Sequence, residues 1–122
     1  MKEQTLVLGA SANPYRYSNR AIHMLRDIEQ KVLALGKKED FVRDVEILTD
    51  KSKISSEEVD TITLYLNARN QEEYKDWIKS LNPRRVIFNP GAENVAFARE
   101  LEEAGVEVNF ACTLVMLRTG QY

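Results

Sequence analysis

Short apolar runs recur along this chain and alternate with segments that have the periodicity of helices. The runs typical of buried strands are residues 5–8, 31–35, 45–48, 61–66, 85–88 and 106–110. Strands that alternate with helices form a parallel sheet whose two faces are both covered. The sequence therefore predicts an α/β protein: a three-layer Rossmann-like domain with a mainly parallel sheet and helices on both faces.

Helical segments lie between most of these runs. The expected helices and their ends are 19–30 after an N-cap at Ser18, 70–81 with an N-cap at Asn70, and 93–104 before Gly105. A shorter helix or turn is expected at 112–117, and a single helical turn near 55–58. The segment 37–44 is mostly charged and leads to the strand at 45–48.

Length and composition restrict the class of protein. A chain of 122 residues is expected to form one domain, residues 1–122, with one core. The net charge of −2 at pH 7 provides no field for nucleic acid or an anionic membrane, so neither is expected as a partner. Cys112 is the one cysteine, which excludes an intrachain disulfide and fits a reducing cytoplasm. No apolar run approaches the roughly 20 residues that cross a bilayer, and no signal-peptide stretch is present, so a cytoplasmic location is expected.

A turn of small residues, Gly9-Ala10-Ser11, directly follows the first predicted strand and precedes the first helix. Backbone N–H groups in such a turn can hold a phosphate, and the helix dipole adds about half a positive charge. The side chains of Asn13 and Ser18 can donate hydrogen bonds, and Arg16 and Arg20 are cationic near the helix start. The full Gly-x-Gly-x-x-Gly pattern is absent, so an ordinary turn with solvated arginines is the alternative interpretation.

A second turn, Gly36-Lys37-Lys38, follows the second predicted strand. In a dinucleotide-binding fold this position meets the ribose of the ligand, and an NAD site has an acidic residue there. Two lysines instead suit a phosphorylated ribose. The position therefore favours coenzyme A and, as a second choice, NADP, whereas a merely solvated loop is the alternative.

Groups suited to catalysis are few. His23 is the only histidine and lies within the first predicted helix, so a surface or packing role is favoured and a zinc site is not expected. Cys112 follows the last predicted strand and is expected to be buried and inert. The alternative is that Cys112 faces the cleft, with its pKa lowered by a helix beginning at Thr113, and meets a ligand thiol. No catalytic residue is predicted.

Together these motifs resemble the small stand-alone CoA-binding proteins, whose fold is that of the CoA-binding domain of the succinyl-CoA synthetase α-subunit. The matching segments are residues 5–11, 13–14, 18–21, 35–38, 59–66, 88–94 and 111–117. The resemblance implies that coenzyme A binds on a Rossmann-like domain. The contacts that it implies are a pyrophosphate cradle of Gly9, Ala10, Ser11 and Asn13 assisted by Arg16 and Ser18, a ribose-phosphate contact at Lys37, and a groove lined by Asn67, Arg69, Pro90 and Gly91.

The chain departs from the larger relatives of this family. It lacks the domain that carries the phosphorylated histidine of the synthetase and any ATP-grasp segment, so ligase activity is not implied. The expected function is non-catalytic binding of coenzyme A or an acyl-CoA, a small-molecule ligand, with the protein partner unknown. The alternatives are a small NADP-binding reductase-like protein and a regulatory interaction subunit with a vestigial nucleotide site.

Overall fold

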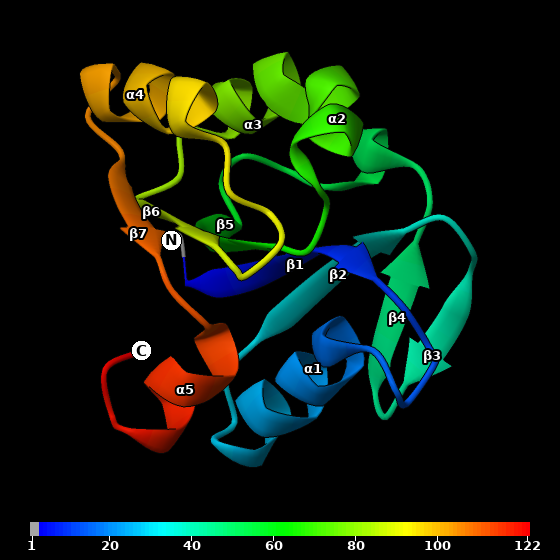
Figure 1. Cartoon of the computed structure of the whole chain (residues 1–122). Coiled ribbons are helices and arrows are strands. Elements are labelled where there is room, and N and C mark those ends of the chain that lie inside the picture. Colours follow the sequence, from blue (N-terminus) through cyan, green and yellow to red (C-terminus); the bar gives the residue numbers. More distant parts are fainter. Residues whose placement is uncertain (1–2) are drawn as a thin grey trace.

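A twisted sheet of seven strands runs through the centre of the described chain, which comprises residues 3–122 of this computed structural model (Figure 1). The strands are β1 (Gln4–Ala10), β2 (Val32–Gly36), β3 (Asp40–Val42), β4 (Val45–Leu48), β5 (Val59–Leu64), β6 (Arg85–Phe88) and β7 (Glu107–Phe110). Their order in the sheet is β3-β4-β2-β1-β5-β6-β7, and all neighbouring pairs are parallel except β3 with β4. Without β3 this is the strand order of a Rossmann sheet, so the predicted fold class is confirmed.

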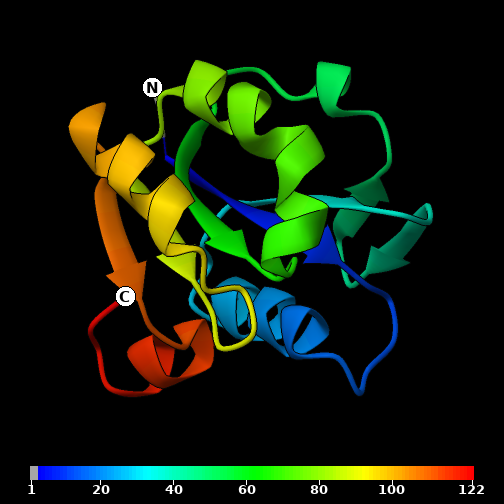
Figure 2. The same ribbon diagram turned by 45° about the horizontal axis from the view of Figure 1, so that its top comes forward.

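Helices cover both faces of the sheet, as Figures 1 and 2 show from two angles. The helices on one face are α1 (Tyr17–Asp27) and α5 (Thr113–Arg118), and those on the other are α2 (Ala68–Gln71), α3 (Lys75–Leu81) and α4 (Val95–Glu103). The chain leaves the adjacent strands β1 and β5 toward opposite faces, because α1 follows β1 and α2 follows β5. A crevice therefore opens beyond the carboxyl ends of these two strands, where ligands bind in sheets of this kind.

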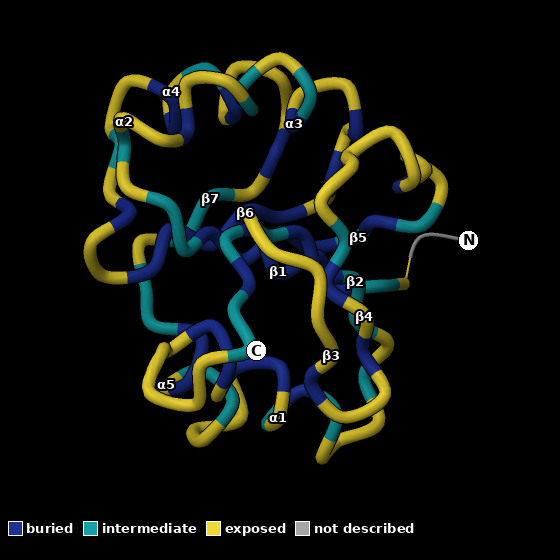
Figure 3. The backbone as a smooth tube through the Cα atoms, turned by 90° about the vertical axis from the view of Figure 1, so that its right-hand side faces the viewer, coloured by how far each residue is buried: buried dark blue, intermediate teal, exposed yellow. Residues whose placement is uncertain are grey.

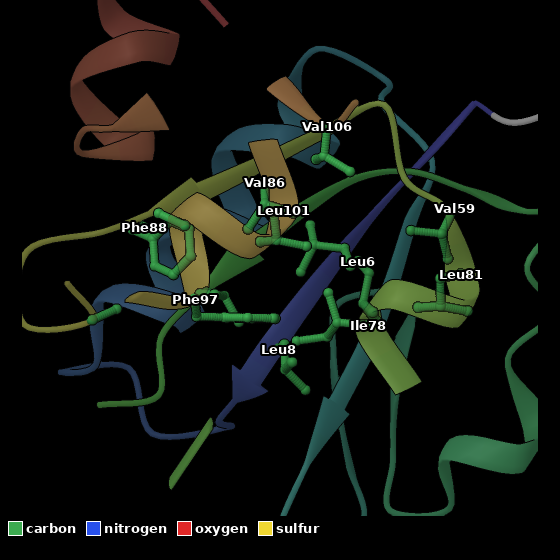
Figure 4. Close-up of a cluster of buried hydrophobic side chains, with 14 of the residues drawn as sticks. Leu6, Leu8, Val59, Ile78, Leu81, Val86, Phe88, Phe97, Leu101 and Val106 are labelled. Atoms are coloured by element: carbon green, nitrogen blue, oxygen red, sulfur yellow. The ribbon is translucent and has the colours of Figure 1, made fainter. Parts of the chain in front are cut away.

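The core consists of two apolar layers, one on each side of the sheet. Buried residues gather along the strands at the centre of the molecule (Figure 3). On the side of α3 and α4, Leu6 and Leu8 of β1 pack in one cluster with Phe97 (Figure 4). On the other side, Val7 packs with Ile22 of α1. Successive residues of a strand point to opposite faces, so a strand covered on both sides needs apolar residues at every position. This requirement explains why the strands appear in the sequence as continuous apolar runs.

The sequence pattern does not predict one strand, β3, which lies within the charged segment. β3 forms an antiparallel hairpin with β4 at the edge of the sheet and takes the place of a crossover helix between β2 and β4. Val42 is buried, whereas Asp40 and Phe41 are exposed. Three residues with a single buried apolar side chain carry too little pattern to identify a strand, and charged residues are common at sheet edges.

Two of the expected helix N-caps are wrong. α1 begins at Tyr17 with Arg16 in the N-cap position, so Ser18 is not the cap but lies buried in the first turn. The cap of α2 is Asn67, whose Oδ1 accepts a hydrogen bond from the backbone N–H of Asn70 at 2.8 Å. Several serines and asparagines precede each helix, and sequence alone does not show which of them meets the first free N–H.

The remaining local expectations have mixed outcomes. The 3₁₀ turn in the connection to β5 is at Lys51–Lys53, whereas residues 55–58 form only a hydrogen-bonded turn. A second 3₁₀ turn, Glu72–Tyr74, joins α2 to α3. The end of α4 at Gly105 is confirmed: Gly105 follows the helix with a φ of +86°, which glycine adopts readily. The short helix expected near residue 112 is α5.

Candidate functional site

A cleft of about 890 Å³ lies beyond the carboxyl ends of β2, β1, β5 and β6, at the crevice where the chain diverges. The segment that follows each of these strands contributes to its walls. The lining residues are Leu8–Asn13, Arg16–Ser18, Leu35–Lys38, Asp40, Tyr65–Asn67, Asn70, Glu73, Tyr74 and Pro90–Ala92. Of the residues that the resemblance implies, all except Arg69 line this cleft.

Gly9 lies in the last part of β1, which extends to Ala10 and so continues into the turn expected at residues 9–11, and its backbone φ of +94° favours glycine. A Cβ atom here would lie 3.0 Å from the carbonyl carbon of Tyr65, just beyond β5. The missing side chain therefore makes room for the neighbouring loop, while the backbone of Gly9 contributes to the cleft lining. The glycine is explained by its conformation and by this close contact between two loops.

Hydrogen bonds within the first loop fix its shape. The N–H of Asn13 donates to Ser11 Oγ at 3.0 Å, and the N–H of Tyr15 donates to Asn13 Oδ1 at 3.0 Å. The buried side chain of Asn19, from α1, donates to the carbonyl oxygen of Ser11 at 3.1 Å. Because Ser11 and Asn13 use acceptor atoms in these bonds, the Ser11 hydroxyl proton and the Asn13 amide N–H groups are left to donate to a ligand.

α1 starts at the edge of the cleft, and no side chain caps its N-terminus. Arg16 occupies the N-cap position without a side-chain bond to the first turn. The leading N–H groups of a helix have no partner within the helix, and the helix dipole places about half a positive charge at this end. Arg16 and Ser18 both line the cleft beside these groups. This arrangement suits an anion such as a phosphate group.

The basic end of the cleft follows β2. A Cβ atom on Gly36 would lie 2.3 Å from the carbonyl oxygen of Ala10, so the ends of β1 and β2 are in close contact. This contact brings Lys37 and Lys38 next to the first loop, and neither lysine has an ion pair within residues 3–122. Asp40 lines the same wall, and its carboxylate accepts the N–H of Phe41 at 2.7 Å. Two exposed cations and one carboxylate therefore form this end.

The opposite wall comes from the segments after β5 and β6. Asn67 and the pair Pro90-Gly91 line the cleft, as the resemblance implies. Asn67 already uses its Oδ1 to cap α2, which leaves its amide N–H groups for a ligand. Arg69 lies exposed on α2 outside the lining, so the structure does not bring it together with the other residues.

A family model described as a CoA binding domain matches residues 3–118. The chain belongs to the CoA binding domain family. Among solved structures it is similar to an uncharacterized protein, with 38% identity, a TM-score of 0.92, and coverage of 100% of this chain and 99% of that one. No match was found among curated proteins.

Two more distant structures show the same fold. The cell-free ID.343 protein from Thermus thermophilus is 20% identical, with a TM-score of 0.83 and coverage of 98% of this chain and 91% of that one. A hypothetical protein from Pyrococcus horikoshii OT3 is 18% identical, with a TM-score of 0.84 and coverage of 97% and 83%. At these identities the likeness supports the architecture of the CoA binding domain and nothing finer.

Sequence reasoning missed Gln71 as a residue that shapes the cleft of this CoA binding domain. Gln71 is fully buried, and its Nε2 donates to the carbonyl oxygens of Leu66 at 2.8 Å and Ala92 at 2.7 Å. Its Oε1 accepts from Asn94 Nδ2 at 3.0 Å. Gln71 therefore ties the segment after β5 to the segment after β6. In the sequence it stands in a polar run, and nothing in that run marks it as buried.

Asn89 has a similar positioning role on the other side of the CoA binding domain. Its buried Nδ2 donates to Thr63 Oγ1 at 2.7 Å and to the carbonyl oxygen of Leu64 at 2.9 Å. Its Oδ1 accepts the N–H of Thr113, the first residue of α5, at 2.8 Å. One side chain thus joins the ends of β5 and β6 to the start of α5. The sequence identified the Asn-Pro-Gly turn here but assigned it only to the groove.

The two residues considered for catalysis lie outside the cleft of this CoA binding domain. His23 is exposed on α1. Cys112 is half-buried rather than buried, so that expectation is wrong, and it lines a second cavity beside the cleft. Residues 3–122 contain no group of three or more His, Cys, Asp or Glu side chains arranged to hold a metal ion. In the same part of the chain, no helix has the length and apolar character needed to cross a membrane.

Proposed function

We propose that this protein binds coenzyme A or an acyl-CoA in the cleft without transforming it. The observation that carries this proposal is the contact between the ends of β1 and β2 at Gly36. This contact brings Lys37 and Lys38, which form no ion pair within residues 3–122, to the same cleft as the N-terminus of α1. A helix N-terminus of this kind can bind a phosphate group. Coenzyme A combines a diphosphate with a phosphorylated ribose, so its charges match these two adjoining groups. Membership of the CoA binding domain family supports the same ligand.

The strand order provides a direction for the ligand. The loops after β2, β1, β5 and β6 stand in a row, and neighbouring strands are about 4.8 Å apart. In this proposal the ribose phosphate meets Lys37, and the diphosphate meets residues 9–13 with Arg16 and Ser18. The pantetheine arm then passes Asn67 and the Pro90-Gly91 pair. The ligand therefore lies across the strands, with its thiol end toward β6.

Few contacts are needed for useful affinity. Hydrogen bonds to ionised groups contribute roughly 1.5–3 kcal/mol each, and micromolar binding requires about 8 kcal/mol. The helix N-terminus, Arg16 and the two lysines provide more than enough such donors. Asp40 and Glu73 also line the cleft, and their negative charges offset part of this attraction.

The lining of the cleft supports binding rather than reaction. Its described residues include no histidine or cysteine, and its two carboxylates, Asp40 and Glu73, are exposed. Enzymes usually activate a general base by burying it beside other charged groups, and neither of these carboxylates is buried. The groups that remain are hydrogen-bond donors and cations, which hold an anionic ligand.

NADP is the second candidate ligand, because it also carries a diphosphate and a phosphorylated ribose. The specific feature in its favour is the same pair of lysines after β2. Isothermal titration with coenzyme A, dephospho-CoA, NADP and NAD separates the two ligands. We expect micromolar binding of coenzyme A, at least tenfold weaker binding of dephospho-CoA, and weaker binding of both dinucleotides.

A pair of variants tests the contact at the basic end. Lys37→Gln should weaken coenzyme A about tenfold and leave dephospho-CoA unchanged, because only the former has the ribose phosphate. Lys53→Gln is the matched control, since Lys53 is an exposed lysine outside the cleft lining. Equal loss for both ligands would contradict the role of Lys37. Tight binding of NADP but not coenzyme A would replace the proposed ligand, and binding of neither would overturn the proposal.

A further inference from the structure

A second cavity of about 380 Å³ adjoins the cleft on the side of α1 and α5. Its lining residues are Tyr17, Arg20, Tyr65, Asn89, Pro90, Cys112, Leu114, Val115 and Arg118. Tyr17, Tyr65 and Pro90 line both spaces, so the cavity and the cleft meet. α1 and α5 lie side by side on one face of the sheet (Figures 1 and 2). The lining residues place the cavity between these two helices, near the carboxyl ends of β5 and β6.

The charges of this cavity are all positive. Arg20 comes from α1 and Arg118 from α5, and the lining includes no carboxylate. Within residues 3–122 neither guanidinium forms an ion pair or a hydrogen bond, and Arg20 lies over the ring of Tyr17, 5.6 Å from its centroid. Six other arginines and lysines of residues 3–122 have an ion pair, for example Arg26 with Asp44 at 2.8 Å. Two unpaired cations from separate helices therefore border one cavity.

Much of the rest of the wall is apolar or hydrogen-bonded, and the exceptions include the Cys112 thiol and the buried Tyr65 hydroxyl, which has no hydrogen-bond partner within residues 3–122. Leu114 and Val115 contribute aliphatic side chains to the wall. The amide of Asn89 is already hydrogen-bonded, because its Nδ2 donates to β5 and its Oδ1 accepts from the start of α5. Burial raises the pKa of the Tyr65 hydroxyl to about 12, while the hydroxyls of Thr63 and Thr113 act in the opposite direction. Tyr65 is therefore neutral at physiological pH, and the two arginines alone set the charge of the cavity.

The cavity lies where the far end of the proposed ligand would arrive. With the ribose phosphate at β2 and the diphosphate at β1, the thiol end points past β5 toward β6, and Pro90 leads from the cleft into the cavity. A volume of about 380 Å³ equals that of roughly a dozen liquid waters, which is ample for an acyl group of three to five carbons. A neutral acyl chain would leave both arginines without a partner, whereas a carboxylate accepts two N–H bonds from a guanidinium.

We propose that this second cavity binds the acyl group of an acyl-CoA and selects acyl groups that end in a carboxylate. The proposal rests on the proposed function, because it extends the same ligand from the cleft into the cavity. The ligand class is the CoA thioester of a short dicarboxylic acid. Arg20 and Arg118 are the specificity-determining residues, and the aliphatic wall of α5 contacts the methylene groups of the acyl chain.

Titration with matched acyl-CoA pairs tests the proposal. Malonyl-CoA is compared with propionyl-CoA, and glutaryl-CoA with pentanoyl-CoA, so that each pair differs by a terminal carboxylate in place of a methyl group. We expect at least one carboxylated member to bind about tenfold or more tightly than its partner. The preference should weaken as salt rises from 0.05 to 0.5 M, a range chosen because exposed charges are screened.

Variants locate the source of this preference. The double variant Arg20→Gln, Arg118→Gln should lose the preference for the carboxylated thioester while binding the neutral one as before. Arg99→Gln is the control, because Arg99 is exposed on α4, on the other face of the sheet. Both arginines in the cavity are exposed, so the thermal unfolding midpoint of the double variant should remain near that of the unaltered protein.

The outcomes separate this inference from the function on which it rests. If coenzyme A and all thioesters bind but no pair shows a preference, the selection of carboxylates is wrong and the proposed function stands. A preference that survives in the double variant would show that the carboxylate is recognised elsewhere, which also overturns the inference. If neither coenzyme A nor any thioester binds, the proposed function itself has failed.

Discussion

At the scale of single residues, the close contact at Gly36 predicts that a larger residue there lowers the stability of the fold. Gly36→Ala places a methyl group 2.3 Å from the carbonyl oxygen of Ala10, so two backbone segments must separate. We expect a loss of about 3 kcal/mol in the free energy of unfolding, measured by urea denaturation. Gly91→Ala is the comparison, because its Cβ meets nothing within 4 Å and only its φ of +94° resists substitution. That variant should lose about 1 kcal/mol. Equal losses would contradict the contact.

Single residues are also where sequence reasoning reached its limit. The sequence predicted Gly36 as part of a turn, whereas it is the last residue of β2. The approach of Ala10 depends on the pairing of β1 with β2 and has no local signal. Asn67, Asn89 and Asn94 look alike as polar loop residues. In the structure the first and third cap helices, whereas Asn89 is buried and holds α5 in place. Which role each asparagine takes is decided by tertiary contacts that the sequence does not display.

At the scale of elements, an ion pair joins the beginnings of β5 and β6. Arg84 donates to both carboxylate oxygens of Asp60 at 2.9 Å. Desolvation raises the pKa of Asp60, but hydrogen bonds from Arg84 and Thr61 outweigh it, so the pKa lies below its usual value. A carboxylate with a lowered pKa stabilises the fold above its unfolded pKa, about 3.9, and this stability is lost as the pH falls through the lowered value.

Asp60→Asn should therefore reduce stability in a way that depends on pH. We expect a loss of about 1 kcal/mol at pH 7, because the pair is partly exposed, and a much smaller loss at pH 3. Urea denaturation at pH 7, 5 and 3 measures the difference from the unaltered protein. Glu57→Gln is the control, since Glu57 is exposed and makes no side-chain hydrogen bond within residues 3–122. A loss of the same size at every pH would show that the carboxylate charge is not responsible.

The helices and strands that the sequence predicts best are those in which burial requires a long pattern of apolar residues. The strands of the central sheet are covered on both faces, so their apolar runs are continuous, and α3 shows its buried stripe through Ile78 and Leu81. β3 was not predicted, because an edge strand of three residues buries only Val42 and shows no apolar pattern. The loops after β2, β1 and β6 line one cleft, as expected from the rule that parallel strands bring their carboxyl ends together, and their role as a binding site stays a prediction. Arg69 lies outside the cleft lining, because the direction of α2 does not follow from that rule.

At the scale of the whole molecule, a ligand in the cleft would connect segments from both halves of the sheet. Adding coenzyme A at 100 times its dissociation constant should slow amide hydrogen exchange by up to about 100-fold where the bound form shields the backbone. The protected segments should be residues 9–18, 36–40, 65–70 and 90–92 together. Residues 104–106, between α4 and β7, are the internal control. Protection confined to the loops after β1 and β2 would contradict a ligand that crosses all four strands.

The hydrogen bonds of Asn89 have a consequence for how this fold varies between family members. One amide serves Thr63, Leu64 and Thr113 at once, and the hydroxyls of Thr63 and Thr113 bond to each other at 2.8 Å. Loss of the polar side chain at position 63, 89 or 113 therefore removes a hydrogen bond from a buried group at another of these positions. These positions should therefore change together during divergence or not at all. Lys37 has no such dependence, because within residues 3–122 its side chain forms no hydrogen bond or ion pair. Position 37 can therefore diverge by single substitutions, whereas the residues that hold the start of α5 in place are expected to be conserved together.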